Sequence, residues 1–252
     1  MKVKRKRLNI YLLPSFLTTS NILFGYLSLI YTLNGKYKLA ALWIIIAGIL
    51  DAWDGILARL TKTTTEFGMQ LDSLADTISF GVAPSLLLHF WGLKSLGQTG
   101  WVFSFIFLTS GVLRLARFNV LPSNYQEKKY SIGLSIPAAS LCLAALVIFN
   151  PHPIENKISA LFIALLALML SILMISKLKY QSYKAINVHQ KKNLKTILLL
   201  AVAIAGIAIY TRIVLLSLMA IYILSSPLNV LVDYLKRKFK TRQEKLEIQE
   251  KN

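Results

Sequence analysis

Long apolar runs constrain the fold of this chain more than any other feature. The sequence has 252 residues, of which 55% are hydrophobic, and several apolar stretches are long enough to cross a membrane. A run of about 20 apolar residues indicates a transmembrane helix. A soluble core of this chain length could not bury so much apolar surface. We therefore expect an all-α fold, a polytopic integral membrane protein in one domain, because helices satisfy their own backbone groups in lipid.

The apolar runs predict about eight transmembrane helices. Their ranges are 15–33, 39–60, 69–91, 100–119, 133–150, 157–176, 194–211 and 213–232. Residues 1–14 are basic at their start, and we expect them to lie on the membrane surface. Residues 233–252 mix charged and polar side chains and are expected to form a polar cytoplasmic tail.

The distribution of positive charge predicts how these helices are oriented. The formal net charge is +18, which in a soluble chain would raise the question of nucleic acid. In a membrane protein, lysine and arginine are instead enriched on cytoplasmic loops and face anionic lipid head groups. With the N-terminus inside, 24 of the 29 basic residues fall on the cytoplasmic side. We therefore predict N-in/C-in topology, a bilayer with anionic head groups as partner, and no nucleic acid.

Four of the five aspartates in the chain are concentrated between residues 51 and 76, where apolar runs flank them on both sides. At 3.6 residues per turn, each half of this stretch places its acidic and small residues on one helix face. The residues concerned are Asp51, Asp54, Gly55, Ala58 and Arg59 in the first helix, and Gly68, Asp72 and Asp76 in the second. If the two helices are antiparallel neighbours, four carboxylates converge, and the small residues leave space for a ligand.

Clustered carboxylates in an apolar setting indicate bound cations. Each intramembrane aspartate costs about 2.5–3.5 kcal/mol at a helix centre, and ionised neighbours repel one another. Oxygen ligands without histidine or cysteine favour Mg²⁺ or Mn²⁺ over zinc, and paired ions typically clamp a phosphoryl group. The alternative is a set of interfacial helix-end charges without function, but such charges would not be expected to share faces with small residues on both helices.

The stretch resembles the motif of the CDP-alcohol phosphatidyltransferases, D-x-x-D-G-x-x-A-R, eight residues, then G-x-x-x-D-x-x-x-D, and every specified position is met. The resemblance implies that two divalent metal ions, Mg²⁺ or Mn²⁺, are held by Asp51, Asp54, Asp72 and Asp76, with Asp76 as the catalytic base. It also implies a cleft for the CDP-lipid. The residues that would shape this cleft are Gly55, Ala58, Arg59 and Gly68. Residues 15–150 would then form the catalytic core, and residues 151–232 would add C-terminal helices.

Segments outside the motif resemble the branch of the family that uses CDP-diacylglycerol and L-serine. These segments are residues 14–26, 79–84, 114–119 and 133–139, although Ser135 stands where that branch usually has proline. The resemblance implies transfer of a phosphatidyl group to serine, with release of CMP, and a homodimer. The distribution of positive charge predicts that the active site faces the cytoplasm from the cytoplasmic membrane. Arg114 and Arg117 share a helix face and are candidates for binding the acceptor or a phosphate, unless they only flank the span at the interface.

Three other functions compete with this interpretation. The same chemistry with glycerol 3-phosphate or an inositol phosphate as acceptor would need a denser basic pocket. An intramembrane prenyltransferase would need a second acidic motif, whereas the fifth aspartate, Asp233, stands alone in the sequence. A cation transporter would need polar residues through the midplane of several helices, and the predicted spans after residue 133 contain few of them.

Overall fold

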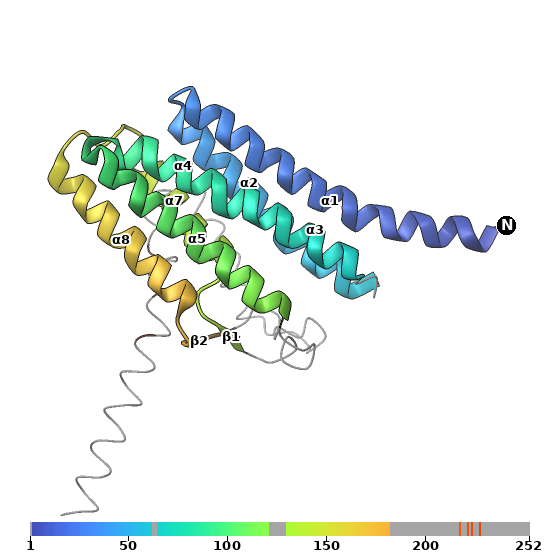
Figure 1. Ribbon diagram of the computed structural model, residues 1–252. Helices are drawn as coiled ribbons and strands as arrows, with labels where there is room; N and C mark the ends of the chain where they lie inside the picture. The colour runs from blue at the N-terminus through green and yellow to red at the C-terminus, as the bar shows by residue number, and fades with distance from the viewer. Residues whose placement is uncertain are drawn as a thin grey trace, which may run out of the picture.

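The structure, a computed structural model, is a bundle of long helices (Figure 1). It describes residues 2–61, 65–120 and 130–181, together with Ser217, Ile221, Ile223 and Pro227. The six spans predicted between residues 15 and 176 are helical, so the predicted helical fold is confirmed for this part of the chain. The predicted spans 194–211 and 213–232 and the predicted tail lie outside the described residues, apart from those four positions.

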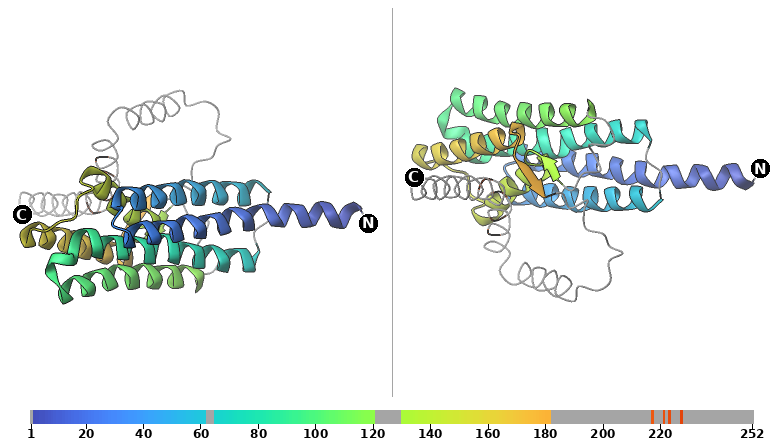
Figure 2. Two further views of the ribbon diagram at one scale, coloured as in Figure 1. Left: turned by 90° about the horizontal axis from the view of Figure 1, so that it is seen from above. Right: turned by 90° about the horizontal axis from the view of Figure 1, so that it is seen from below.

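The described bundle consists of seven α-helices, two π-helical segments and one 3-10 turn. The α-helices are α1 (Lys2–Leu33), α2 (Tyr37–Thr61), α3 (Glu66–Asp76), α4 (Ala83–Leu87), α5 (Gln98–Val120), α7 (Ile136–Phe149) and α8 (Lys157–Ile175). The π-helical segment η1 (Thr77–Val82) joins α3 to α4. The π-helical segment η2 (Leu88–Leu93) and the 3-10 turn η3 (Lys94–Leu96) continue α4, so that the stretch from α3 to η3 forms one rod. Both views of Figure 2 show α1 between α2 and this rod, with α5 on the rod's other side.

Four of the described helical stretches are long and apolar enough to cross a membrane, and α7 is a shorter apolar helix. The four stretches are Phe16–Leu33, Glu66–Leu96, Gln98–Val120 and Lys157–Ile175. Residues 2–14, predicted as a separate surface segment, continue directly into the first span, since α1 is one unbroken helix (Figure 1). The total of eight spans, the contact of residues 1–14 with the membrane surface and the cytoplasmic position of both termini stay predictions.

Small side chains let the helices of the bundle approach one another closely. Fully buried alanines occur on several of the described helices. They include Ala40 and Ala47 of α2, Ala139 of α7 and Ala164 of α8. Between helices in a membrane, close packing of small residues takes the place of the hydrophobic driving force that acts in water. These alanines therefore contribute to the stability of the bundle by allowing close contact between helix backbones.

The buried stripe of α1 is small and polar. It consists of Thr18, Asn21, Gly25, Ser28 and Thr32, spaced alternately three and four residues apart, which is one helix face. A β-carbon at Gly25 would lie 2.5 Å from Ser79 Oγ, so α1 meets η1 at backbone distance. Ser79 donates from Oγ to the main-chain oxygen of Asn21 at 2.8 Å. These contacts set the register of α1 against the rod that carries Asp72 and Asp76.

A short two-stranded ladder, which the sequence pattern does not predict, joins the segment before α7 to the segment after α8. Strand β1 (Tyr130–Ile132) pairs antiparallel with β2 (Lys179–Gln181). Gly133 follows β1 with a φ of +77°, and a β-carbon there would clash with the main-chain oxygen of Met174. Both the positive φ and the close approach of another backbone require glycine at this position.

Replacing Gly133 with alanine is expected to lower the melting temperature of the detergent-purified protein. A non-glycine residue in this backbone conformation costs about 1–3 kcal/mol, and the clash with Met174 adds to that cost. Gly35→Ala is the matched control, because Gly35 has a φ of +70° and no atom of the described residues lies within 4 Å of a β-carbon there. Equal decreases in the two variants would contradict the role of the close approach.

Candidate active site

The four clustered aspartates lie on two helices that both pack against α1. Asp51 and Asp54 are in α2, whereas Asp72 and Asp76 are in α3. Thr65 caps the N-terminus of α3 with its side chain, and α3 ends at Asp76, where the π-helical segment η1 begins. π-Helical turns within helices occur frequently at functional sites.

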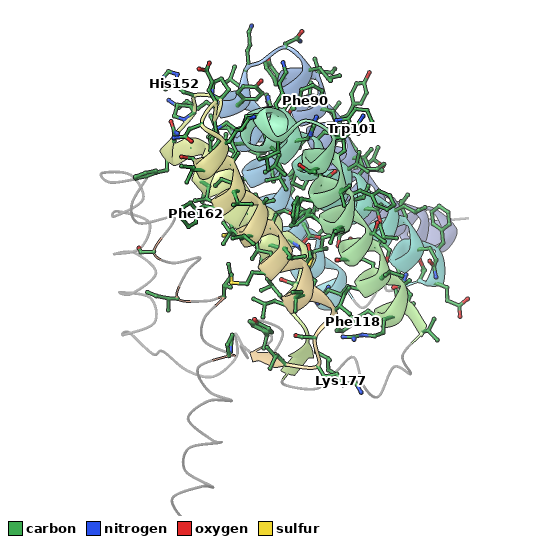
Figure 3. The ribbon with its side chains drawn as sticks, turned by 60° about the vertical axis from the view of Figure 1, so that its left-hand side comes forward. Phe90, Trp101, Phe118, His152, Phe162 and Lys177 are labelled. Carbon is green, nitrogen blue, oxygen red and sulfur yellow. The ribbon has the colours of Figure 1, made fainter. Side chains whose placement is uncertain are left out.

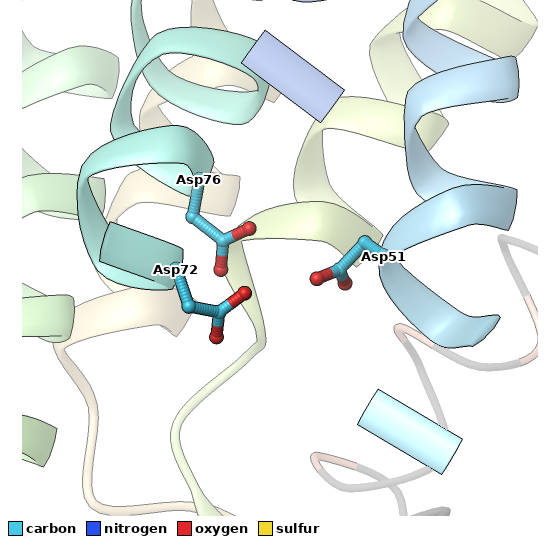
Figure 4. Close-up of side chains that lie close together, drawn as sticks. All are labelled: Asp51, Asp72 and Asp76. Carbon is cyan, nitrogen blue, oxygen red and sulfur yellow. The ribbon is translucent and has the colours of Figure 1, made fainter. Parts of the chain in front are cut away.

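Three of the four carboxylates approach one another between α2 and α3 (Figure 4). One oxygen atom from each of Asp51, Asp72 and Asp76 lies within 4.8 Å of the other two. Two oxygen ligands on opposite sides of a Mg²⁺ ion lie about 4 Å apart. A small contraction would therefore bring all three oxygens onto one ion.

The surroundings of Asp76 favour a bound cation. Asp76 is 8% exposed, and its Oδ1 has no hydrogen-bond partner among the described residues. It experiences the negative charges of Asp51 and Asp72 and, more weakly, of Asp54, while the positive charge of Arg114 opposes them. Buried charges are unfavourable unless they are compensated. The set of carboxylate oxygens therefore fits a hard divalent ion such as Mg²⁺ or Mn²⁺.

Asp54 is held beside this group by α1. Its side chain is 7% exposed, and Oδ2 accepts a hydrogen bond from Thr18 Oγ1 at 2.6 Å. Asp54 is not among the three converging carboxylates, although it is close enough to Asp76 to interact with it electrostatically. The structure thus brings three predicted ligands together and orients the fourth toward Thr18.

Arg114 lies close to the acidic group. Its side chain is buried, its charge acts on Asp76, and its guanidinium carbon lies 4.6 Å from the centroid of the Phe118 ring. Figure 3 shows Phe118 near the end of α5, at the same end of the bundle as Lys177. Arg114 is therefore placed to attract an anionic group that approaches Asp76.

Arg117 makes a different set of contacts. It donates from Nη1 to the main-chain oxygen of Ile175 at 3.1 Å and from Nη2 to that of Ile132 at 3.2 Å. Ile175 is the last residue of α8, where main-chain oxygens lack a helical partner. Arg117 thus ties α5 to the ends of α8 and β1.

The residues predicted to shape the CDP-lipid cleft are placed by their helices. Gly55, Ala58 and Arg59 follow Asp54 in α2, and their side chains lie outside the described part of the structure. Gly68 is in the first turn of α3, and its N–H donates to Thr65 Oγ1 at 3.0 Å. A β-carbon at Gly68 would lie 3.1 Å from that hydroxyl oxygen, so a larger residue would press on the helix cap.

Two polar contacts near the site were not predicted from the sequence. One is the hydrogen bond of Thr18 with Asp54. The other joins α3 to α5, where Asn119 donates from Nδ2 to Ser73 Oγ at 3.0 Å. The available signal for Thr18 was its spacing of three residues from Asn21, which puts two polar side chains on one face of an apolar span.

Replacing Asp72 with asparagine should have opposite effects with and without divalent ions. Without them, the variant is expected to melt at a higher temperature than the unsubstituted protein, because one of several like charges is removed. With Mg²⁺ or Mn²⁺ the order should reverse, since the intact site gains more stability from binding. Thermal denaturation in detergent with chelator or added metal measures both effects.

Glu155→Gln provides the control for this experiment, because Glu155 is an exposed carboxylate in the connection between α7 and α8. Its melting temperature should follow that of the unsubstituted protein in both conditions. A difference for Asp72→Asn that does not depend on divalent ions would contradict a metal site.

Comparisons with known proteins extend the resemblance of the motif to most of the chain. Similar proteins include enzymes named CDP-diacylglycerol–serine O-phosphatidyltransferase from three organisms. The Helicobacter pylori protein is 38% identical over 196 residues, covering 77% of this chain and 80% of the relative. The Bacillus subtilis protein is 33% identical over 184 residues (73% and 96%), and that of Methanocaldococcus jannaschii is 36% identical over 172 residues (68% and 74%).

The family comparison covers the aspartate site and the helices that surround it. The model described as CDP-alcohol phosphatidyltransferase matches residues 11–173, a range that includes α2, α3 and the acidic cluster. The predicted family is therefore confirmed: this chain belongs to the CDP-alcohol phosphatidyltransferases.

Proposed function

We propose that this protein transfers the phosphatidyl group of CDP-diacylglycerol to the hydroxyl group of L-serine, giving phosphatidylserine and CMP. The observation that carries the proposal is the convergence of Asp51, Asp72 and Asp76, with one oxygen of Asp76 unpartnered among the described residues. The names of the relatives support serine as the acceptor. Family membership also favours phosphatidyl transfer over cation transport and over prenyl transfer.

The proposed ligands of two divalent ions are Asp51, Asp54, Asp72 and Asp76. When bound, Mg²⁺ or Mn²⁺ would neutralise charge on the phosphoryl oxygens and on the leaving group. The protein's own part is to hold the carboxylates in place from α2 and α3, which both pack against α1, so that little reorganisation is needed when substrate enters.

Asp76 is the proposed catalytic base. Its buried Oδ1 has no donor among the described residues, so this atom is suited to accept the proton of the serine hydroxyl. The serine oxygen then forms a bond to the lipid-bearing phosphorus, and the bond from that phosphorus to the bridging oxygen breaks. CMP leaves with the electron pair of that bond.

Arg114 is the better placed of the two candidate arginines to bind the serine carboxylate or a phosphate. It is buried and acts electrostatically on Asp76, whereas two donors of Arg117 bind main-chain oxygens. Arginine suits both anions because its planar donors match carboxylate and phosphate groups.

A site that faces the cytoplasm would have access to both substrates, the CDP-lipid head group and serine. The proposed location is the cytoplasmic membrane, with the basic N-terminus and loops against anionic head groups. The CDP moiety would lie along Gly55, Ala58, Arg59 and Gly68, and the functional unit would be a homodimer. Both statements extend the resemblance of the motif to this chain.

An acceptor assay with one labelled CDP-diacylglycerol tests the proposed reaction. L-serine should give labelled phosphatidylserine and CMP, while glycerol 3-phosphate and inositol 1-phosphate should give little product. Asp76→Asn should abolish CMP release in the presence of serine, because its amide cannot accept the proton. Preferred use of a phosphorylated acceptor would overturn the serine assignment, and turnover by Asp76→Asn would overturn the assignment of the base.

Replacing each arginine with glutamine should separate the proposed roles. Arg114→Gln is expected to raise the KM for serine or lower kcat by about tenfold or more, since a charged hydrogen bond contributes about 1.5–3 kcal/mol. Arg117→Gln is expected mainly to lower the melting temperature, because it releases the ends of α8 and β1. A specific loss of serine affinity in Arg117→Gln, with unchanged stability, would reverse these assignments.

A further inference from the structure

A threonine on α1 contacts the acidic site from a helix that carries none of the motif. Thr18 is 5% exposed, and its Oγ1 donates to Asp54 Oδ2 at 2.6 Å across a sequence separation of 36 residues. We infer that Thr18 is a positioning residue, which orients the Asp54 carboxylate for binding a divalent ion. This inference rests on the proposed metal-dependent function.

The contact engages one oxygen of Asp54, and the other oxygen is the one that would meet a cation. A carboxylate that is hydrogen-bonded through one oxygen has less freedom to rotate, and ligands of metal ions are commonly oriented in this way by a second layer of residues. Threonine is suited to this task because branching at its β-carbon restricts its side chain to few rotamers in a helix. The Thr18 hydroxyl therefore restricts the orientation of the Asp54 carboxylate.

The position of Thr18 is itself set by packing on the rod that carries the other carboxylates. Gly25 lies two helical turns further along α1, where a β-carbon would lie 2.5 Å from Ser79 Oγ. Ser79 follows Asp76 by three residues and binds the main-chain oxygen of Asn21. A single set of contacts thus places α1 relative to Asp76 and brings Thr18 to Asp54.

A purely structural role for the hydroxyl makes a different prediction. If Thr18 only satisfied a buried carboxylate, its loss would lower stability and leave metal affinity unchanged. If Thr18 orients Asp54, its loss must weaken metal binding even in protein that remains folded. Direct measurement of metal binding therefore distinguishes the two roles.

The experiment uses the full chain, purified in detergent and stripped of metal, with Mn²⁺ as the probe. Titration followed by electron paramagnetic resonance of free Mn²⁺ gives the Kd without any need for turnover. Thr18→Val, which keeps the shape and removes the donor, should raise the Kd of at least one site by about 10-fold or more. Thr18→Ser, which keeps the donor, should bind Mn²⁺ nearly as the unsubstituted protein does.

Thr32→Val is the matched control. Thr32 is 1% exposed on the same stripe of α1, about 21 Å further along the helix at 1.5 Å per residue. The Kd for Mn²⁺ should not change in this variant. If Thr18→Val does not fold, Thr18→Ala takes its place and the same order of affinities is expected.

The outcomes separate this inference from the function on which it rests. Unchanged Mn²⁺ binding in Thr18→Val, or equal weakening in Thr18→Ser or Thr32→Val, would overturn the positioning role alone. An unsubstituted protein that binds no Mn²⁺ and releases CMP without divalent ions would overturn the proposed metal site as well. Weakening confined to the variants that lack the donor would support Thr18 as the residue that orients Asp54.

Discussion

The accumulation of carboxylates inside an apolar helical bundle is the constraint on which this structure depends. Asp54 and Asp76 are both buried, and Asp51 and Asp72 lie close enough to Asp76 to repel it. Buried charges are tolerated only with compensating charge or hydrogen bonds. Arg114 and Thr18 provide part of that compensation, and divalent ions would provide the remainder. The same electrostatic demand that opposes folding thus favours ligand binding.

Close helix packing keeps this acidic group together. Small residues on α1 bring it against η1, where Ser79 meets Gly25 and the backbone of Asn21. At the end of the bundle near Phe118, Arg117 joins α5 to the ends of α8 and β1. These contacts involve no motif residue, yet they hold α1 against η1, the continuation of α3, and hold α5 against the ends of α8 and β1. The site is therefore a property of the whole helical core.

In the proposed site, the residues that would bind the donor and the residue that would bind the acceptor lie on different helices. The acidic residues of α2 and α3 belong to the motif that resembles the whole family, and in the proposed reaction they serve the chemistry of the CDP-lipid donor. Arg114, by contrast, lies on α5, outside that motif. In the same reaction it would meet the acceptor or a phosphate. A common donor site with a separate acceptor side would let related enzymes transfer the same group to different alcohols.

The sequence by itself determined the helical fold and the local geometry of the acidic motif. Apolar length predicts helices, and helical periodicity puts Asp51 with Asp54, and Asp72 with Asp76, on single faces. Only the tertiary structure decided that Asp54 turns to Thr18 and that Arg117 binds two main-chain oxygens. It also decided the pairing of β1 with β2. Periodicity describes neighbours along one helix, whereas these contacts join residues far apart in the chain and depend on how the helices pack.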